Sequence, residues 1–135
     1  MSQSEHSNIT NLTIYKKSLD VFKLCRHIAA YVTNDKDIIA MHVSKNHIDK
    51  YADKLVMDAL GLIPKIVETE NETNSIKKLK HAKDLRFFID RLYYNTKYLN
   101  TKNTNSTDFI KLLRIEIKKL RIIHKQYVRS LVQKN

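Results

Sequence analysis

The sequence predicts an all-α protein, an up-down-up-down bundle of four helices. Its 135 residues include one Gly and one Pro, which leaves almost no material for the tight turns that join antiparallel strands. Apolar residues recur at spacings of three and four in four segments, and polar stretches rich in Ser, Asn and Thr separate these segments. The length suits one domain. We therefore expect a flexible N-terminal segment over residues 1–11 and a single four-helix-bundle domain over residues 12–135.

The first two predicted helices span residues 12–32 and 36–67. Cys25 lies within the apolar stripe of the first, where it is expected to be a small core residue and not a nucleophile. The second has a heptad-like stripe that only Lys45 interrupts, and Pro64 predicts a kink or an early end. The two stripes consist of Val21, Phe22, Cys25, Ile28, Ala29 and Val32, and of Met41, Ile48, Ala52, Leu55, Ala59, Leu62 and Ile66.

The last two predicted helices span residues 75–100 and 106–132. His124 occupies a core-facing position in the second of them, so a buried and hydrogen-bonded imidazole is expected there. The stripe of the third helix consists of Leu79, Ala82, Leu85, Ile89, Leu92 and Leu99. That of the fourth consists of Ile110, Leu113, Ile117, Leu120, His124, Tyr127 and Leu131.

The net charge of +11 is concentrated in the second half of the chain. Residues 1–72 contain 9 Lys/Arg and 10 Asp/Glu, whereas residues 73–135 contain 16 and 4. Such an asymmetry between two halves of a chain is typical of proteins with an anionic partner.

A row of cations follows the fourth predicted helix within about 80° of arc. Like charges at this spacing repel one another by a few tenths of a kcal/mol per pair, which suggests that an anionic partner compensates the repulsion. Nucleic-acid phosphates are the first candidate, and an acidic protein or a membrane surface is the other. A membrane is disfavoured because the neighbours of the row are expected in the bundle core. The predicted nucleic-acid contacts are Lys111, Arg114, Lys118, Arg121, Lys125 and Arg129.

The third predicted helix places further cations and aromatic rings opposite its apolar stripe. The cations Lys80, Lys83 and Arg91 extend the predicted nucleic-acid surface. The rings of Phe87, Tyr94 and Tyr98 share this outer face, where they could stack on bases or pack against another copy of the chain. We favour the second interpretation, an oligomer interface, because rings spaced along a rigid helix suit helix packing better than splayed bases.

The sequence contains no motif for catalysis, cofactor binding or metal binding. A chain with one Gly cannot form a phosphate-cradling Gly loop, and six His with one Cys match no zinc spacing. Some small helical bundles cleave RNA with an Arg followed four to six residues later by a His. The nearest pair here, Arg121 and His124, is three residues apart. We therefore expect a non-enzymatic protein without cofactor or metal.

Two stretches carry a family resemblance. They are LTIYKKSLDVFKL at residues 12–24 and KLKHAKDLRFFIDRL at residues 78–92. With the helical layout of residues 12–132, the chain resembles the bacterial four-helix-bundle family of ribosomal-RNA intervening-sequence proteins and of Avd, the accessory variability determinant of diversity-generating retroelements. It lacks the Phe-Pro-x-x-Glu-Arg stretch of that family between the first two helices, and the C-terminal Gly-Gly-Trp of many Avd proteins. The resemblance implies a ring-shaped homo-oligomer, commonly a pentamer, that binds nucleic acid and assists a reverse transcriptase.

The combined prediction is a cytoplasmic, oligomeric, non-catalytic accessory protein that binds the phosphate backbone of RNA or DNA. Its cytoplasmic location is expected because the sequence contains neither a leader nor a span of about 20 apolar residues. The alternative is a protein-interaction adaptor whose basic face docks an acidic partner.

Overall fold

The computed structural model of the chain describes residues 8–99 and 104–134. The flexible segment expected at the N-terminus lies mostly outside these residues. Residues 8–11 form a helical turn in which Ile9 is buried.

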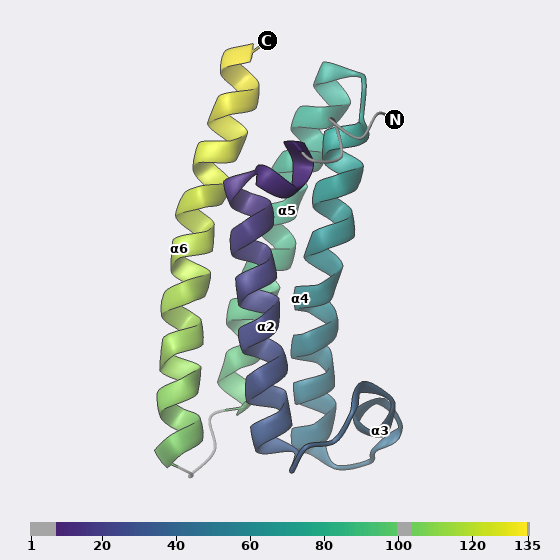
Figure 1. Ribbon diagram of the computed structural model, residues 1–135, viewed down its shortest axis with the longest axis vertical. Coiled ribbons are helices and arrows are strands. Elements are labelled where there is room, and N and C mark those ends of the chain that lie inside the picture. Colours follow the sequence, from purple (N-terminus) through teal and green to yellow (C-terminus); the bar gives the residue numbers. More distant parts are fainter. Residues whose placement is uncertain (1–7, 100–103, 135) are drawn as a thin grey trace.

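Four long helices pack antiparallel, and each contacts the two helices beside it (Figure 1). Going around the bundle, α2 lies beside α4, α4 beside α5, α5 beside α6, and α6 beside α2. The predicted up-down-up-down bundle is therefore confirmed. The helices are α2 (Thr13–Val32), α4 (His47–Asn71), α5 (Ser75–Asn95) and α6 (Thr104–Lys134).

The predicted apolar stripes form the core of the bundle. All seven predicted core residues of α6 are buried, including His124 and Tyr127. In the other helices most stripe residues are buried, and the exceptions, Phe22, Val32, Ile48 and Leu79, are partly buried and pack against the core. Because three- and four-residue spacing keeps one helix face toward its neighbours, this spacing was sufficient to identify the core.

The predicted second helix is in fact two helices, so its continuous span over residues 36–67 is wrong. The short helix α3 (Ile38–Val43) ends before Ser44, and α4 begins at His47. The side chain of Asn46 accepts hydrogen bonds from the backbone N–H of Ile48 at 2.8 Å and of Asp49 at 3.3 Å, so it caps α4. This local capping overrides the apolar period, because Ser and Asn side chains compete for backbone donors.

Helix α4 continues through Pro64 to Asn71, so an early end near Pro64 is also wrong. Pro64 is exposed, while Leu62 and Ile66 on either side of it are buried. Packing of this buried face holds the helix together where the proline lacks a backbone donor.

The third predicted helix ends earlier than expected. Helix α5 stops at Asn95, and Thr96–Leu99 form a 3₁₀ turn, η1. Thr96 donates its hydroxyl to the carbonyl of Tyr93 at 2.6 Å, and the amide of Asn95 donates to Asp58 on α4 at 2.7 Å. These side-chain bonds fix the end of α5 against α4.

Among the residues that the structure describes, no helix is both long enough and apolar enough to cross a membrane.

Candidate nucleic-acid interface

Cations from two helices meet where α5 packs on α6. We name this surface the α5–α6 seam. Four of its cations line one pocket, two of its arginines share a carboxylate, and the remaining cations lie over Tyr93 or against η1. The seam consists of Lys83 and Arg86 on α5, and of Arg114, Lys118, Arg121, Lys125 and Arg129 on α6.

The middle of the seam is organised around Asp90. Arg86 donates from Nε to Oδ1 of Asp90 at 2.8 Å, and Arg121 donates from Nε to the same oxygen at 3.1 Å. The guanidinium of Arg121 also lies over the ring of Tyr93, with its carbon 4.5 Å from the ring centroid. These contacts hold Arg121 at 25% side-chain exposure, between the two helices.

The predicted row of six α6 cations divides into two groups. Arg114 and Arg121 are partly buried and turned toward α5, where Nε of Arg114 donates to the hydroxyl of Thr96 at 3.0 Å. Lys111, Lys118, Lys125 and Arg129 are exposed. The exposed group is therefore free to meet a partner, whereas the arginines also join the two helices.

The predicted cations of α5 point in different directions. Lys83 is exposed and lines the pocket of the seam, and Lys80 is exposed beyond it. Arg91 is turned toward α4, with its Nε 3.5 Å from Asp58 and its guanidinium over the ring of Phe88. Arg86 is not among the residues predicted from the sequence, although its position three residues after Lys83 on the same side of the helix was an available signal.

The aromatic face of α5 is exposed but partly occupied within the chain. The hydroxyls of Tyr94 and Tyr98 lie 2.8 Å apart, and the ring of Tyr98 stacks on that of Tyr51 from α4, with centroids 4.5 Å apart. The hydrogen bond to Tyr94 raises the pKa of the Tyr98 phenol. Phe87, at 74% exposure, is the ring of this face that is most open to solvent.

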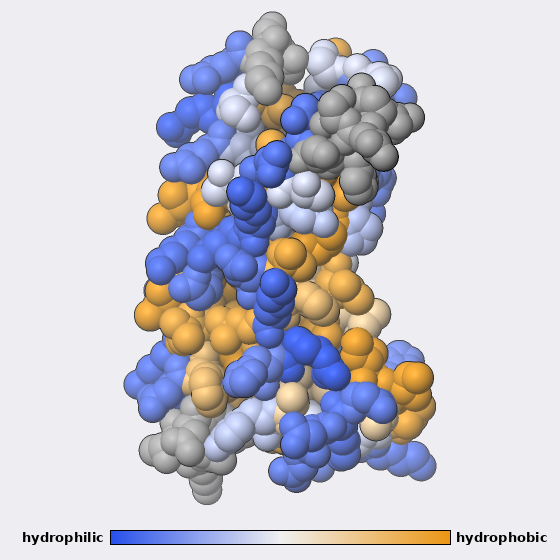
Figure 2. Space-filling view, viewed as in Figure 1, coloured by the Kyte–Doolittle hydropathy of each residue, from blue (hydrophilic) through white to orange (hydrophobic). Residues whose placement is uncertain are grey.

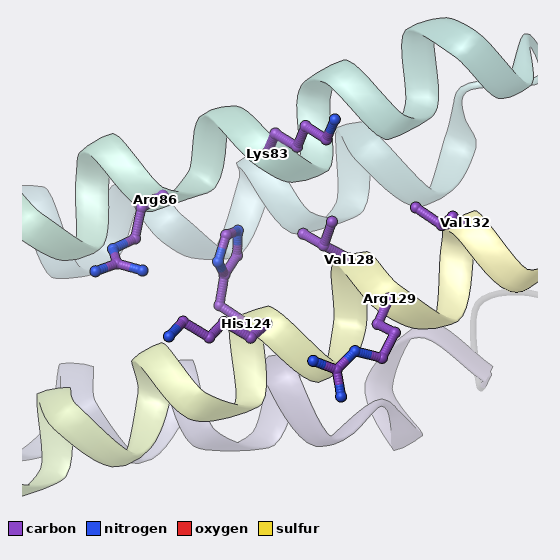
Figure 3. Close-up of a pocket in the computed structure, with 7 residues that line it drawn as sticks. Lys83, Arg86, His124, Val128, Arg129 and Val132 are labelled. Atoms are coloured by element: carbon purple, nitrogen blue, oxygen red, sulfur yellow. The ribbon is translucent and has the colours of Figure 1, made fainter.

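His124 forms part of the pocket in the seam (Figure 3). Its Nε2 lies 2.7 Å from the carbonyl of Ala82 on α5 and donates to it, so the neutral ring leaves Nδ1 unprotonated. Burial is the main cause of a lowered pKa, and the charge of Arg86 adds to it, while the Ala82 bond and Asp90 oppose it. The imidazole is therefore neutral at neutral pH, as its predicted core position indicated.

Apolar side chains lie exposed beside the basic row of α6. Ile115 and Ile122 on α6 are exposed, and helical geometry places them next to the basic row, on its side away from the core. Further apolar exposure occurs on α3, at Ile39 and Val43. Figure 2 shows apolar patches between hydrophilic ones on the sides where α6 and α3 lie. The expectation that only core residues flank the basic row is therefore wrong.

Two further observations concern Cys25 and metal-ligating side chains. Burial, followed by the charge of Asp58, raises the pKa of the Cys25 thiol to about 12, so it stays protonated. Within residues 8–99 and 104–134, no three His, Cys, Asp or Glu side chains gather in a group that could hold a metal ion.

No protein-family model, curated protein or solved structure matches this chain.

Proposed function

We propose that this chain is a non-catalytic accessory protein that binds the phosphate backbone of RNA or DNA through the α5–α6 seam. The observation that carries the proposal is the gathering of seven cations from two helices along the α5–α6 seam, where Asp90 pairs with two of them, Arg86 and Arg121. Exposed lysines on a rigid helix can neutralise successive phosphates without reading bases. The partly buried Arg114 and Arg121 present a fixed charge behind them.

A homo-oligomer would multiply this basic surface by the number of subunits. We propose that the exposed ring of Phe87, with Tyr94 and Tyr98 beside it, joins the copies. A pentameric, Avd-like assembly that assists a reverse transcriptase or another RNA- or DNA-processing enzyme is the specific form that the family resemblance suggests.

The proposal is tested by measuring the anisotropy of labelled single-stranded RNA and DNA of the same sequence between 50 and 200 mM salt. The logarithm of the binding constant should fall linearly with the logarithm of the salt concentration, with a slope of about 0.9 or less for each phosphate contact. Charge reversal of the three exposed lysines of the seam, Lys83, Lys118 and Lys125, to Glu should abolish binding at the higher salt concentration.

The matched control reverses three exposed lysines outside the seam, Lys16, Lys23 and Lys50. Both triple variants change the net charge equally, so a general charge effect would weaken both to the same extent. Equal weakening, or unchanged affinity of the seam variant, would rule out the seam as the nucleic-acid surface.

A second candidate function is an adaptor for an acidic protein. The exposed Ile115 and Ile122 beside the basic row favour it, because protein interfaces combine an apolar centre with a polar rim. An adaptor would show negligible affinity for both nucleic acids at physiological salt in the same titration.

A further inference from the structure

A pocket of about 390 Å³ lies between α5 and α6 at the C-terminal part of the seam. Figure 3 shows His124 and Val128 pointing toward α5 from α6, while the guanidinium of Arg129 points away from α5. Its volume lies within the range of about 300–1,000 Å³ that is common for small-molecule sites. The residues that line it are Lys83, Arg86, His124, Lys125, Val128, Arg129 and Val132.

The walls of this pocket combine positive charge with an apolar surface. Lys83, Arg86, Lys125 and Arg129 supply four cations, whereas Val128 and Val132 supply no polar group. A phosphate alone would fill a small part of the volume and would gain nothing from the valines. The walls fit a ligand that has an anionic group and an apolar surface.

A nucleotide has this combination of groups. Lysine ammoniums bind phosphate oxygens, and guanidinium groups bind phosphate or stack on the face of a base. We infer that the pocket accommodates one unpaired nucleotide of a bound strand, with its phosphate at the cations and its base against Val128 and Val132. The inference rests on the proposed function and adds to it a place where the strand is held by a base as well as by its backbone.

The ring of His124 lines the pocket, although its Nδ1 is not open to it. Its Nδ1 is a buried acceptor without a hydrogen-bond partner in the described part of the chain, whereas its Nε2 is held by Ala82. A buried acceptor without a partner is unfavourable. Because the ring lines the pocket, its signals report on whether a ligand enters.

Mononucleotides test the pocket independently of polynucleotide binding. Uridine 5′-monophosphate, uridine and ribose 5-phosphate are titrated separately, and NMR follows the methyl groups of Val128 and Val132 and the ring of His124. Uridine monophosphate should shift these signals and bind at least about tenfold more tightly than either fragment. Only this ligand has both a phosphate for the cations and a base for Val128 and Val132. Equal binding of ribose 5-phosphate would exclude a role for the base, and equal binding of uridine would exclude the phosphate contacts.

Two matched variants place a negative charge on α6, one at the rim of the pocket and one outside it. Val132 lines the pocket and Ile115 does not, and both side chains are 51% exposed. Val132→Glu should weaken uridine monophosphate binding at least about tenfold through repulsion of the phosphate, and Ile115→Glu should leave it nearly unchanged. An equal effect of both variants would overturn the assignment of the pocket.

The two proposals fail differently in these experiments. If polynucleotides bind with the expected salt dependence and no mononucleotide shifts the pocket signals, the pocket inference is wrong and the proposed function stands. If a mononucleotide binds in the pocket but polynucleotides do not bind at all, the proposed function is wrong.

Discussion

Arg121 on α6 donates a hydrogen bond from its Nε to the carboxylate of Asp90 on α5, at 3.1 Å. Arg86 uses the same carboxylate oxygen, so one acidic side chain stands between two cations of the seam. The carboxylate draws both guanidinium groups together and also lowers the positive potential that a phosphate would meet. Asp90 is therefore the residue at which stabilisation of the bundle and attraction of an anion oppose each other.

Asp90→Asn should tighten nucleic-acid binding and weaken the fold slightly. Removal of one negative charge from the seam raises its attraction for phosphates, most strongly at low salt. The loss in the free energy of unfolding should be about 1 kcal/mol or less, because the Asp90 side chain is 46% exposed. Anisotropy titrations and urea unfolding measure the two effects.

Asp84→Asn is the control for this prediction, since it makes the same charge change about 120° around α5. It should alter RNA binding much less than Asp90→Asn. Equal tightening by both variants would show that only the total charge matters, and weakened binding by Asp90→Asn would show that the carboxylate positions the arginines for the ligand.

Pro64→Ala should stabilise the chain, because α4 continues through this residue despite its missing backbone donor. Restoring the donor and the helix propensity outweighs the greater freedom of the unfolded chain, so a gain of about 1–2 kcal/mol is expected. The exposed side chain leaves no cavity behind. A higher urea midpoint at an unchanged m-value would confirm the gain.

Gly61→Ala provides an independent comparison in the same helix. A Cβ at Gly61 would meet nothing within 4 Å, so this substitution should add about 0.5–1 kcal/mol through helix propensity alone. If Gly61→Ala stabilises and Pro64→Ala does not, then the proline is accommodated by an arrangement that the restored donor disturbs.

The helical period was sufficient to predict the core but not the ends of the helices. In α6 every predicted stripe residue, from Ile110 to Leu131, is buried, because three- and four-residue spacing alone decides which side of a helix meets its neighbours. The break before α4 depends on one side-chain cap, that of Asn46. Asn46 with Asp49 three residues later resembles a helix-start signal, which the continuing apolar period masked.

The sequence did not predict which neighbouring groups the long cationic side chains contact. A helical wheel gives the angle of a Cβ but not the neighbouring group that a guanidinium reaches. Arg121 and Arg91 reach carboxylates on different helices, Asp90 and Asp58. The seam could therefore be predicted as a basic α6 face with Lys83 beside it, whereas the sharing of Asp90 by Arg86 and Arg121 required the packing of the two helices.

Phe87→Glu should dissociate the proposed homo-oligomer. The ring is 74% exposed on the aromatic face, so a carboxylate there would be placed in the interface between copies without disturbing the core. Light scattering should give the mass of one chain for the variant and a multiple of it for the parent protein. A monomeric parent would leave this face without the proposed role.

Ile76→Glu is the control for the interface, because Ile76 is also a strongly exposed apolar residue of α5, at 80%. It lies near the start of the helix, eleven residues before Phe87, and should leave the oligomer intact. Dissociation by both variants would place the interface along the whole of α5.

The stability of the bundle should fall as the pH drops below the ordinary pKa of histidine, about 6.5, in part because of His124. Burial lowers the pKa of His124 in the folded chain, so the unfolded chain binds a proton at a higher pH than the folded one does. The folded state is therefore destabilised as the pH falls through this range, and stability is retained above it.

His124→Gln retains a donor for the Ala82 carbonyl and removes the titrating group. Urea unfolding at pH 7.5 and 5.5 should show a smaller loss for this variant than for the parent, whereas His81→Gln on α5, which is partly exposed, should lose as much as the parent. An unchanged loss in His124→Gln would assign the pH dependence to other groups.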